Sequence, residues 1–85
     1  MSEEIKKLLA KNKLLLGKDE TMKNLKRGKI EKIFLASNTD ATTKKDIDYY
    51  KDIAGIQVEI VQETNEELGV VCKKPFSISV IGVMK

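Results

Sequence analysis

Histidine is absent from this chain of 85 residues, and cysteine occurs once, at Cys72. A disulfide needs two thiols, and a zinc site needs several thiols or imidazoles, so the chain supplies neither framework by itself. A Ser-His or Cys-His catalytic pair is excluded for the same reason. We therefore expect no catalytic residue, no metal site and no cofactor, and a buried apolar role for Cys72.

Long apolar runs are also missing. The longest uncharged run extends from Pro75 to Met84, about half the length that a membrane-spanning helix needs. The first residues, MSEEIKK, are acidic where a signal peptide would be basic. Hydrophobic residues make up 41% of the chain and charged residues 34%, which is a globular composition. We expect one soluble, cytoplasmic domain over residues 1–85, without a membrane partner.

The net charge of +3 conceals two segments of opposite charge. Residues 6–32 hold ten basic and three acidic side chains, whereas residues 40–67 hold eight acidic side chains and three lysines. If the fold keeps these segments apart, one part of the molecule is basic and a polyanion is its natural partner. The alternative is an ordinary solvated surface.

Four segments have the features of helices. The expected helices cover residues 3–12, 19–28, 44–54 and 64–72. Asp19 is a plausible N-cap of the second, and the helical spacing turns Ile53 or Ala54 inward at the end of the third. Thr64 and Glu67 match the S/T-x-x-E capping box, which predicts the start of the fourth.

Four further segments are rich in strand-forming residues. The expected strands cover residues 14–16, 32–36, 56–60 and 76–84. The second is expected to be central and buried, and the third alternates apolar with polar residues. Strands that alternate with helices predict an α/β fold, a three-layer α/β/α sandwich with a four-stranded mixed sheet.

The first candidate binding segment follows the first strand. It contains the candidate residues Gly17, Lys18, Asp19, Glu20 and Lys23. A glycine between a strand and a helix allows close approach of a ligand, and the helix start presents unpaired N–H groups toward a phosphate or a base edge. The alternatives are that Asp19 only caps the helix and that Lys23 only pairs with Glu20. The segment lacks the GK[ST] end of a Walker loop.

The second candidate segment precedes the last strand. Lys73 and Lys74 are followed by a proline and by Phe76, so charge that neutralises a phosphate backbone stands beside an aromatic ring. Single-stranded or splayed bases require this pairing of charge and stacking surface. The alternative is that Phe76 is the first core residue of the last strand.

The third candidate is Asn38, just after the second strand. Ligands of α/β sheets usually bind at the loops that follow the carboxyl ends of strands, and an amide both donates and accepts toward a base edge. An ordinary Asx turn is the alternative for this residue.

These segments carry a resemblance that covers nearly the whole chain. The matching stretches are LGKDETMKNLKRGKIEKIFLASN, DIDYYKDIAGIQV and NEELGVVCKKPFSISV, in this order. They resemble the kink-turn RNA-binding superfamily of ribosomal proteins, the L7Ae and L30e group, and most closely its archaeal L30e branch. The resemblance implies an α/β/α sandwich that grips a sharply bent RNA internal loop with one end.

The resemblance also assigns roles to individual residues. Gly17, Asp19, Glu20 and Lys23 match the family pattern G-x-N-E-x-x-K, which addresses sheared G·A pairs. The strand-end asparagine of the family corresponds to Asn38, and its loop aromatic corresponds to Phe76.

Two residues depart from the family pattern. Asp19 replaces the usual asparagine, so an acceptor-only carboxylate stands where an amide donor is common, which predicts weaker binding or a different edge being read. Lys73 replaces the usual glycine, which predicts a less sharply bent and more positive loop.

The leading hypothesis is therefore a non-catalytic protein that binds structured RNA as a component of the large ribosomal subunit, next to other ribosomal proteins and without a small-molecule substrate. Its predicted RNA-binding residues are Gly17, Lys18, Asp19, Glu20, Lys23, Asn38, Lys73, Lys74 and Phe76. One alternative is an RNA-binding subunit of a small ribonucleoprotein for modification or processing, or a regulator of its own message. Another is a small enzyme with Cys72 as nucleophile, activated by an adjacent lysine.

Overall fold

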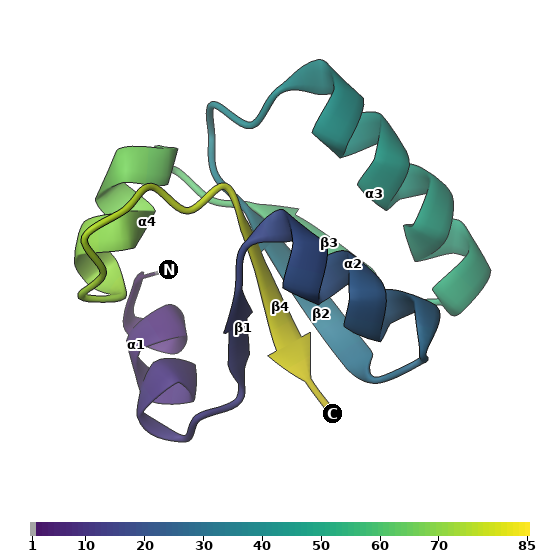
Figure 1. Ribbon diagram of the computed structural model, residues 1–85, viewed down its shortest axis with the longest axis horizontal. Coiled ribbons are helices and arrows are strands. Elements are labelled where there is room, and N and C mark those ends of the chain that lie inside the picture. The colour runs from purple at the N-terminus through teal and green to yellow at the C-terminus, as the bar shows by residue number, and fades with distance from the viewer. Residues whose placement is uncertain (1) are drawn as a thin grey trace.

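The computed structural model describes residues 2–85 and folds them into three layers, with a sheet between two pairs of helices (Figure 1). The helices are α1 (Ser2–Ala10), α2 (Lys18–Lys26), α3 (Ala41–Ala54) and α4 (Asn65–Val71). The strands are β1 (Leu14–Leu16), β2 (Ile30–Leu35), β3 (Gln57–Ile60) and β4 (Val80–Met84). The predicted α/β/α sandwich is confirmed.

The sheet has four strands in the order β1-β4-β2-β3. β2 pairs with β3 in parallel, and β4 pairs antiparallel with both β1 and β2, so the sheet is mixed as predicted. β2 and β4 are central, and this explains why their residues dominate the buried core. The first strand is only half-buried because it lies at an edge of the sheet.

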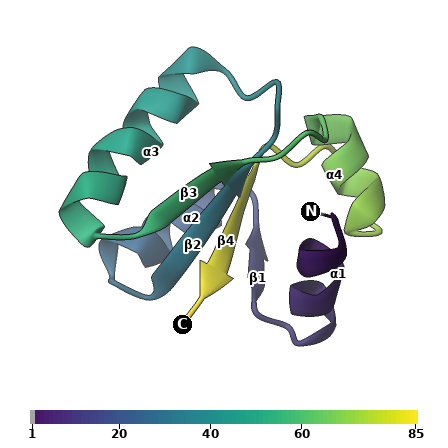
Figure 2. The same ribbon diagram turned by 180° about the vertical axis from the view of Figure 1, so that it is seen from behind.

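Each face of the sheet is covered by its own pair of helices. On one face, Ile5 of α1 and Leu68 of α4 pack against Phe34 of β2. On the other, Leu25 of α2 and Ile47 of α3 form a second cluster with alternate residues of the same strands. Figure 2 shows the two pairs from behind, α1 with α4 and α2 with α3.

This layering corrects the expected separation of charge. The basic segment 6–32 includes both α1 and α2, which cover opposite faces of the sheet. Lys32 within that segment is half-buried and forms ion pairs with Glu4 and Glu59, at 3.6 and 3.4 Å. The basic segment of the sequence is therefore not one basic surface.

The strand directions bring the connecting segments to a common end. β1, β2 and β3 all run the same way, opposite to β4. Their carboxyl ends therefore lie at one edge of the sheet, where β4 begins and where α2, α3 and α4 start. We call this region the strand-end edge; it comprises residues 17–20, 36–40, 61–65 and 76–79.

Several element boundaries differ from the prediction. Gly17, and not Asp19, is the N-cap of α2, and α3 begins at Ala41 because the Asp40 side chain caps it within the expected loop. β2 begins two residues earlier than expected, at Ile30. The third strand also differs in one residue: Ile60 is exposed, although the alternation of apolar and polar residues predicted an inward position.

The expected last strand is shorter at its start. It begins at Val80, because residues 76–79 form a loop that packs along α4. At Gly69 of α4 a Cβ atom would collide with the backbone oxygen of Phe76, so the loop lies directly on the helix backbone. The predicted inward position of Ile53 or Ala54 is also wrong: both are exposed at the end of α3.

Candidate nucleic-acid interface

Gly17 connects β1 to α2 in a conformation that suits glycine. Its φ is 111°, which side chains rarely adopt, and nothing lies within 4 Å of the position a Cβ would take. Its N–H donates to the carbonyl of Val80 at 2.9 Å, which fixes the start of α2 against the start of β4. The backbone at this point is thus both anchored and open to a ligand.

The start of α2 has no side-chain cap. By contrast, Asp40 caps α3 and Thr64 caps α4, the latter in the predicted capping box with Glu67. The first-turn N–H groups of a helix attract acceptors and negative charge when no side chain satisfies them. The first turn of α2 can therefore accept ligand oxygen atoms directly.

Asp19 and Glu20 are exposed in this first turn, and Lys23 is exposed one turn later. The alternative in which Asp19 caps the helix is wrong, because Gly17 occupies the N-cap position without a side-chain bond. Within residues 2–85, Glu20 and Lys23 form no ion pair with each other. These three side chains extend from the strand-end edge into solvent.

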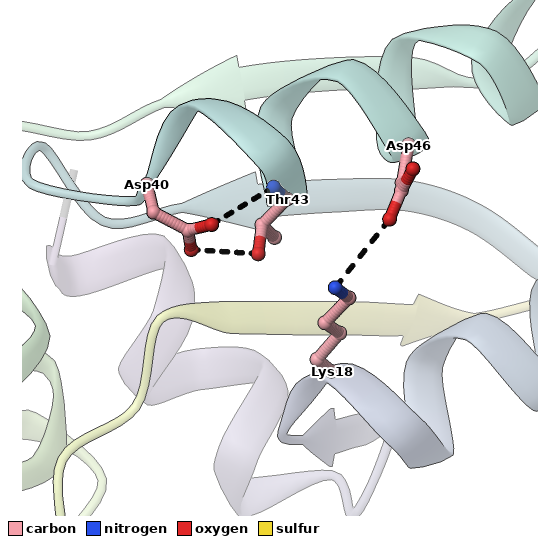
Figure 3. A network of polar contacts seen from close by, with 4 residues as sticks. All are labelled: Lys18, Asp40, Thr43 and Asp46. Atoms are coloured by element: carbon pink, nitrogen blue, oxygen red, sulfur yellow. Dashed lines mark hydrogen bonds and ion pairs between the residues drawn. The ribbon is translucent and has the colours of Figure 1, made fainter.

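Lys18 lies differently from its neighbours. Its ammonium nitrogen Nζ is 3.5 Å from Oδ2 of Asp46, across the gap between α2 and α3 (Figure 3). Both side chains are roughly half-exposed, so the pair contributes little to stability. No pattern in the sequence indicated this contact, which directs Lys18 toward α3.

Asn38 joins two segments of the strand-end edge. Its Nδ2 donates to Oδ1 of Asn65 at 3.0 Å, and its Oδ1 accepts from the backbone N–H of Asn65 at 2.9 Å. Asn38 therefore ties the end of β2 to the first residue of α4 and makes more than a local Asx turn. Asn65 is a residue of this region that sequence reasoning missed; only its place in the capping box marked it.

Thr39 and the backbone hold the remaining loops together. The buried hydroxyl of Thr39 donates to the carbonyl of Ala36 at 2.8 Å and lies 3.2 Å from the carbonyl of Ser79. The N–H of Ser37 donates to the carbonyl of Glu63 at 2.8 Å. These bonds link three separate loops, and they make the strand-end edge a single connected surface. Thr39 was not predicted to take part.

Phe76 lies in the loop beside α4 and is 54% exposed. It is not the first core residue of the last strand, so that alternative is wrong. With Lys74, Val70 and Glu66 it lines a surface hollow of about 390 Å³. The ring is thus available to stack on a flat ligand.

Lys73 is not part of the strand-end edge. It follows α4 at the end opposite Asn65, about one helix length, or roughly 10 Å, from that residue. Its φ is 57°, within the left-handed region that favours glycine, so the chain bends sharply at this lysine. The structure brings together Gly17, Asp19, Glu20 and Asn38 with the loop of Phe76, and leaves Lys73 to one side.

Cys72 has none of the features of a nucleophile. It is buried in the cluster with Ile5 and Leu68, and burial raises the pKa of its thiol, against a weaker opposing effect of Lys74. A raised pKa reduces the thiolate that would react at neutral pH. Its surroundings are those of a small core residue.

Two further properties of the described chain bear on other functions. No helix among residues 2–85 is both long and apolar enough to cross a membrane. Over the same residues, acidic side chains and Cys72 form no group of three that could hold a metal ion.

Comparison with known proteins adds a sequence relationship to this geometry. The model of the family described as "Ribosomal protein L7Ae/L30e/S12e/Gadd45 family" matches residues 1–85. The protein "Large ribosomal subunit protein eL30" of Sulfolobus acidocaldarius is 36% identical over 81 residues, which are 95% of this chain and 78% of that protein. The protein of the same name from Sulfurisphaera tokodaii is 40% identical over 81 residues, 95% of this chain and 76% of that protein.

Solved structures share the fold. A protein with unknown function from Bacillus halodurans aligns with a TM-score of 0.82 at 26% identity, over 92% of this chain and 77% of that one. The 15.5kD RNA binding protein of Giardia lamblia aligns with a TM-score of 0.83 at 20% identity, over 95% of this chain and 68% of that one.

Proposed function

Because the chain belongs to the ribosomal protein L7Ae/L30e/S12e/Gadd45 family, we propose that it binds a kink-turn in ribosomal RNA as a structural component of the large ribosomal subunit. Relatives that it matches over most of their length are large-subunit proteins named eL30, from archaea and also from an animal, Branchiostoma belcheri. A ribosomal role places the chain in the cytoplasm. The family names describe a ribosomal protein and not an enzyme.

The observation that carries the proposal is the shared position of the candidate residues. Gly17, Asn38 and the loop of Phe76 come from three distant parts of the sequence and meet at the strand-end edge. A sharply bent RNA presents two grooves and an exposed base within a short distance, so its recognition requires several loops that are held rigidly together. The hydrogen bonds among these loops meet that requirement.

The first turn of α2 is the part best suited to read base edges. Its uncapped N–H groups and the amide of Asn38 supply donors, and the carboxylate of Glu20 accepts from base amino groups. Lys23 is exposed on the next turn, where it would neutralise a phosphate near the kink. The binding would therefore combine base readout with backbone neutralisation.

Phe76 supplies the stacking surface. Its ring is exposed, and its loop is held on the backbone of α4 beside Lys74. An extruded base or sugar would pack on the ring, while Lys74 attracts the adjacent phosphate. The carboxylate of Glu66 lines the same hollow and limits how closely a phosphate approaches.

Binding measurements with matched RNAs test the proposal. We expect the protein to bind a kink-turn RNA more tightly than a straight duplex of equal length, at moderate salt. Lys23→Ala and Phe76→Ala should each weaken binding to the kink-turn. The matched control is Lys29→Ala, which removes an exposed lysine from the turn between α2 and β2, at the other end of the sheet.

Equal affinity of the protein for kinked and straight RNA would contradict specific recognition. An equal loss of affinity in Lys29→Ala and Lys23→Ala would show that binding depends on general charge and not on the strand-end edge. The place of action is tested by sedimentation, in which we expect the protein to migrate with large ribosomal subunits and not with smaller particles.

A further inference from the structure

Each helix is followed by a residue with a left-handed backbone. Asn12 follows α1 with φ 56°, Gly28 follows α2 with φ 72°, and Gly55 follows α3 with φ 67°. Glycine and asparagine tolerate this conformation. After α4 the same place is taken by Lys73, with φ 57°. Lys73 is thus the exception among the four helix ends.

Two backbone hydrogen bonds accompany the left-handed conformation of Lys73. Its N–H donates to the carbonyl of Val70 at 3.0 Å, and the N–H of Lys74 donates to the carbonyl of Gly69 at 2.9 Å. This is the bonding pattern of a Schellman motif, in which the left-handed position favours glycine. A side chain kept in an unfavourable backbone conformation suggests a use for that side chain.

The lysine side chain lies beside a hollow between α1 and α4. The hollow has a volume of about 250 Å³ and is lined by Lys6, Leu9, Ala10, Val71 and Lys73. Its floor is apolar, and among the described lining residues the charges are the two ammonium groups. Lys73 forms no ion pair with the described residues of the chain. This hollow therefore has a positive rim suited to an anion.

We infer that Lys6 and Lys73 form a second phosphate site, which binds the backbone of an RNA stem as it leaves the strand-end edge. The inference rests on the proposed function, because it extends the same RNA beyond the kink. Both α1 and α4 cover the face of the sheet that also carries the Phe76 loop. The second site is thus on the same side of the molecule as the proposed stacking residue.

Two consecutive lysines connect the two hollows. Lys74 lines the hollow of Phe76, and Lys73, its neighbour in sequence, lines the hollow of Lys6. A nucleic-acid backbone carries regularly spaced charge over such a distance, so it can contact Lys74 and Lys73 in succession. Because the hollow of Lys6 and Lys73 lies next to the proposed RNA site, an RNA phosphate is the anion that we expect it to bind.

Two RNAs distinguish binding at the second site from binding at the first. One contains the kink-turn with the shortest stems that keep it folded, and the other has the same kink-turn with an extended stem. We expect the wild-type protein to bind the extended RNA more tightly. Lys73→Gly and Lys6→Ala should each weaken binding of the extended RNA several-fold and lower its log-affinity slope against log[salt] by about 0.9. Their binding of the short RNA should be unchanged.

Thermal stability gives Lys73→Gly a second readout. Glycine relieves the left-handed position, so the variant should melt at a higher temperature while it binds the extended RNA more weakly. A loss of binding therefore cannot be attributed to unfolding. Lys45→Ala, on α3 at the opposite face of the sheet, is the control and should bind both RNAs as the wild type does.

The outcomes distinguish the two proposals. If both variants bind the extended RNA as the wild type does, the second phosphate site is wrong and the proposed function is untouched. The second phosphate site is also wrong if Lys45→Ala loses as much affinity for the extended RNA as Lys73→Gly and Lys6→Ala do. If the wild-type protein fails to bind the short kink-turn RNA, the proposed function is wrong and this inference is overturned with it.

Discussion

At the scale of single residues, the side-chain amides at the strand-end edge hold the structure together although they are exposed. Asn38 and Asn65 exchange two hydrogen bonds, although both lie at the surface. They connect the loop after β2 to the start of α4, and the carbonyl of Asn65 also accepts from the N–H of Ile78 at 2.9 Å. The Asn38 side chain therefore connects two of the segments proposed to contact RNA, and the backbone of Asn65 connects the third.

Asn38→Ala should lower both stability and RNA affinity. We expect a loss of about 0.5–1.5 kcal/mol in the free energy of unfolding, because side-chain hydrogen bonds contribute about this much. Asn65→Ala should cost a similar amount. Since one bond joins the two side chains and is lost in either single variant, the double variant should lose clearly less than the sum. Urea denaturation of the four proteins measures this, and strictly additive losses would contradict the bridge.

At the scale of helices and strands, local signals predicted most elements and missed what tertiary packing decides. The capping box of Thr64 and Glu67 marked the start of α4 correctly, because it acts through neighbours in sequence. The predicted end of α3 at residue 54 is also correct. The late start of β4 depends on contact of its preceding loop with Gly69, a contact that no local pattern encodes. The sequence did not predict Asp40 as the cap of α3, because no Glu follows three residues later to complete a capping box.

The cap of α3 should make stability depend on pH. Hydrogen bonds from the hydroxyl and the N–H of Thr43 hold the pKa of the Asp40 carboxyl below its usual 3.8. A carboxyl with a lowered pKa stabilises the fold above the unfolded pKa, and this stabilisation is lost as the pH falls through the folded pKa. Asp40→Ala should therefore be less stable than the wild type at neutral pH.

The difference in stability between Asp40→Ala and the wild type should shrink as the pH falls below 3.8. Thermal unfolding of both proteins from pH 7 to pH 2 measures it. Asp48→Ala is a suitable control, because Asp48 is exposed on the same helix and caps nothing. A difference that stays constant over this range would contradict the role of the carboxylate.

The contact between α4 and the Phe76 loop predicts that an alanine in place of Gly69 destabilises the protein, the opposite of what helix propensity predicts. Alanine normally favours a helix over glycine by about 0.5–1 kcal/mol. In Gly69→Ala the new methyl would meet the backbone oxygen of Phe76, so we expect destabilisation and weaker RNA binding instead. Chemical denaturation and RNA titration measure both effects. Val70→Ala changes an exposed position of the same helix and should leave the stability nearly unchanged, so it is the control for the denaturation measurement. A stabilised Gly69→Ala would contradict the contact.

At the scale of the whole molecule, topology and not charge places the candidate site. Ten basic residues in segment 6–32 indicated one basic surface, but α1 and α2 cover opposite faces of the sheet. The residues that do meet are those that follow β1 and β2 or precede β4, because these strand ends share an edge. Sequence patterns could identify Gly17, Asn38 and Phe76 as candidates, and only the strand directions bring them together. The position of Lys73 depends on the length of α4, and this separated it from the group.

The central claim is that RNA contacts the strand-end edge. Amide chemical-shift mapping of the isotope-labelled protein, titrated with a kink-turn RNA, tests it most directly. We predict that the largest shifts occur at Gly17 to Lys23, at Asn38 and at Phe76 to Ser79, while Gly28 and Gly55, at the other end of the sheet, stay unchanged. Large shifts centred on Gly28 and Gly55, with the strand-end edge unaffected, would contradict the account.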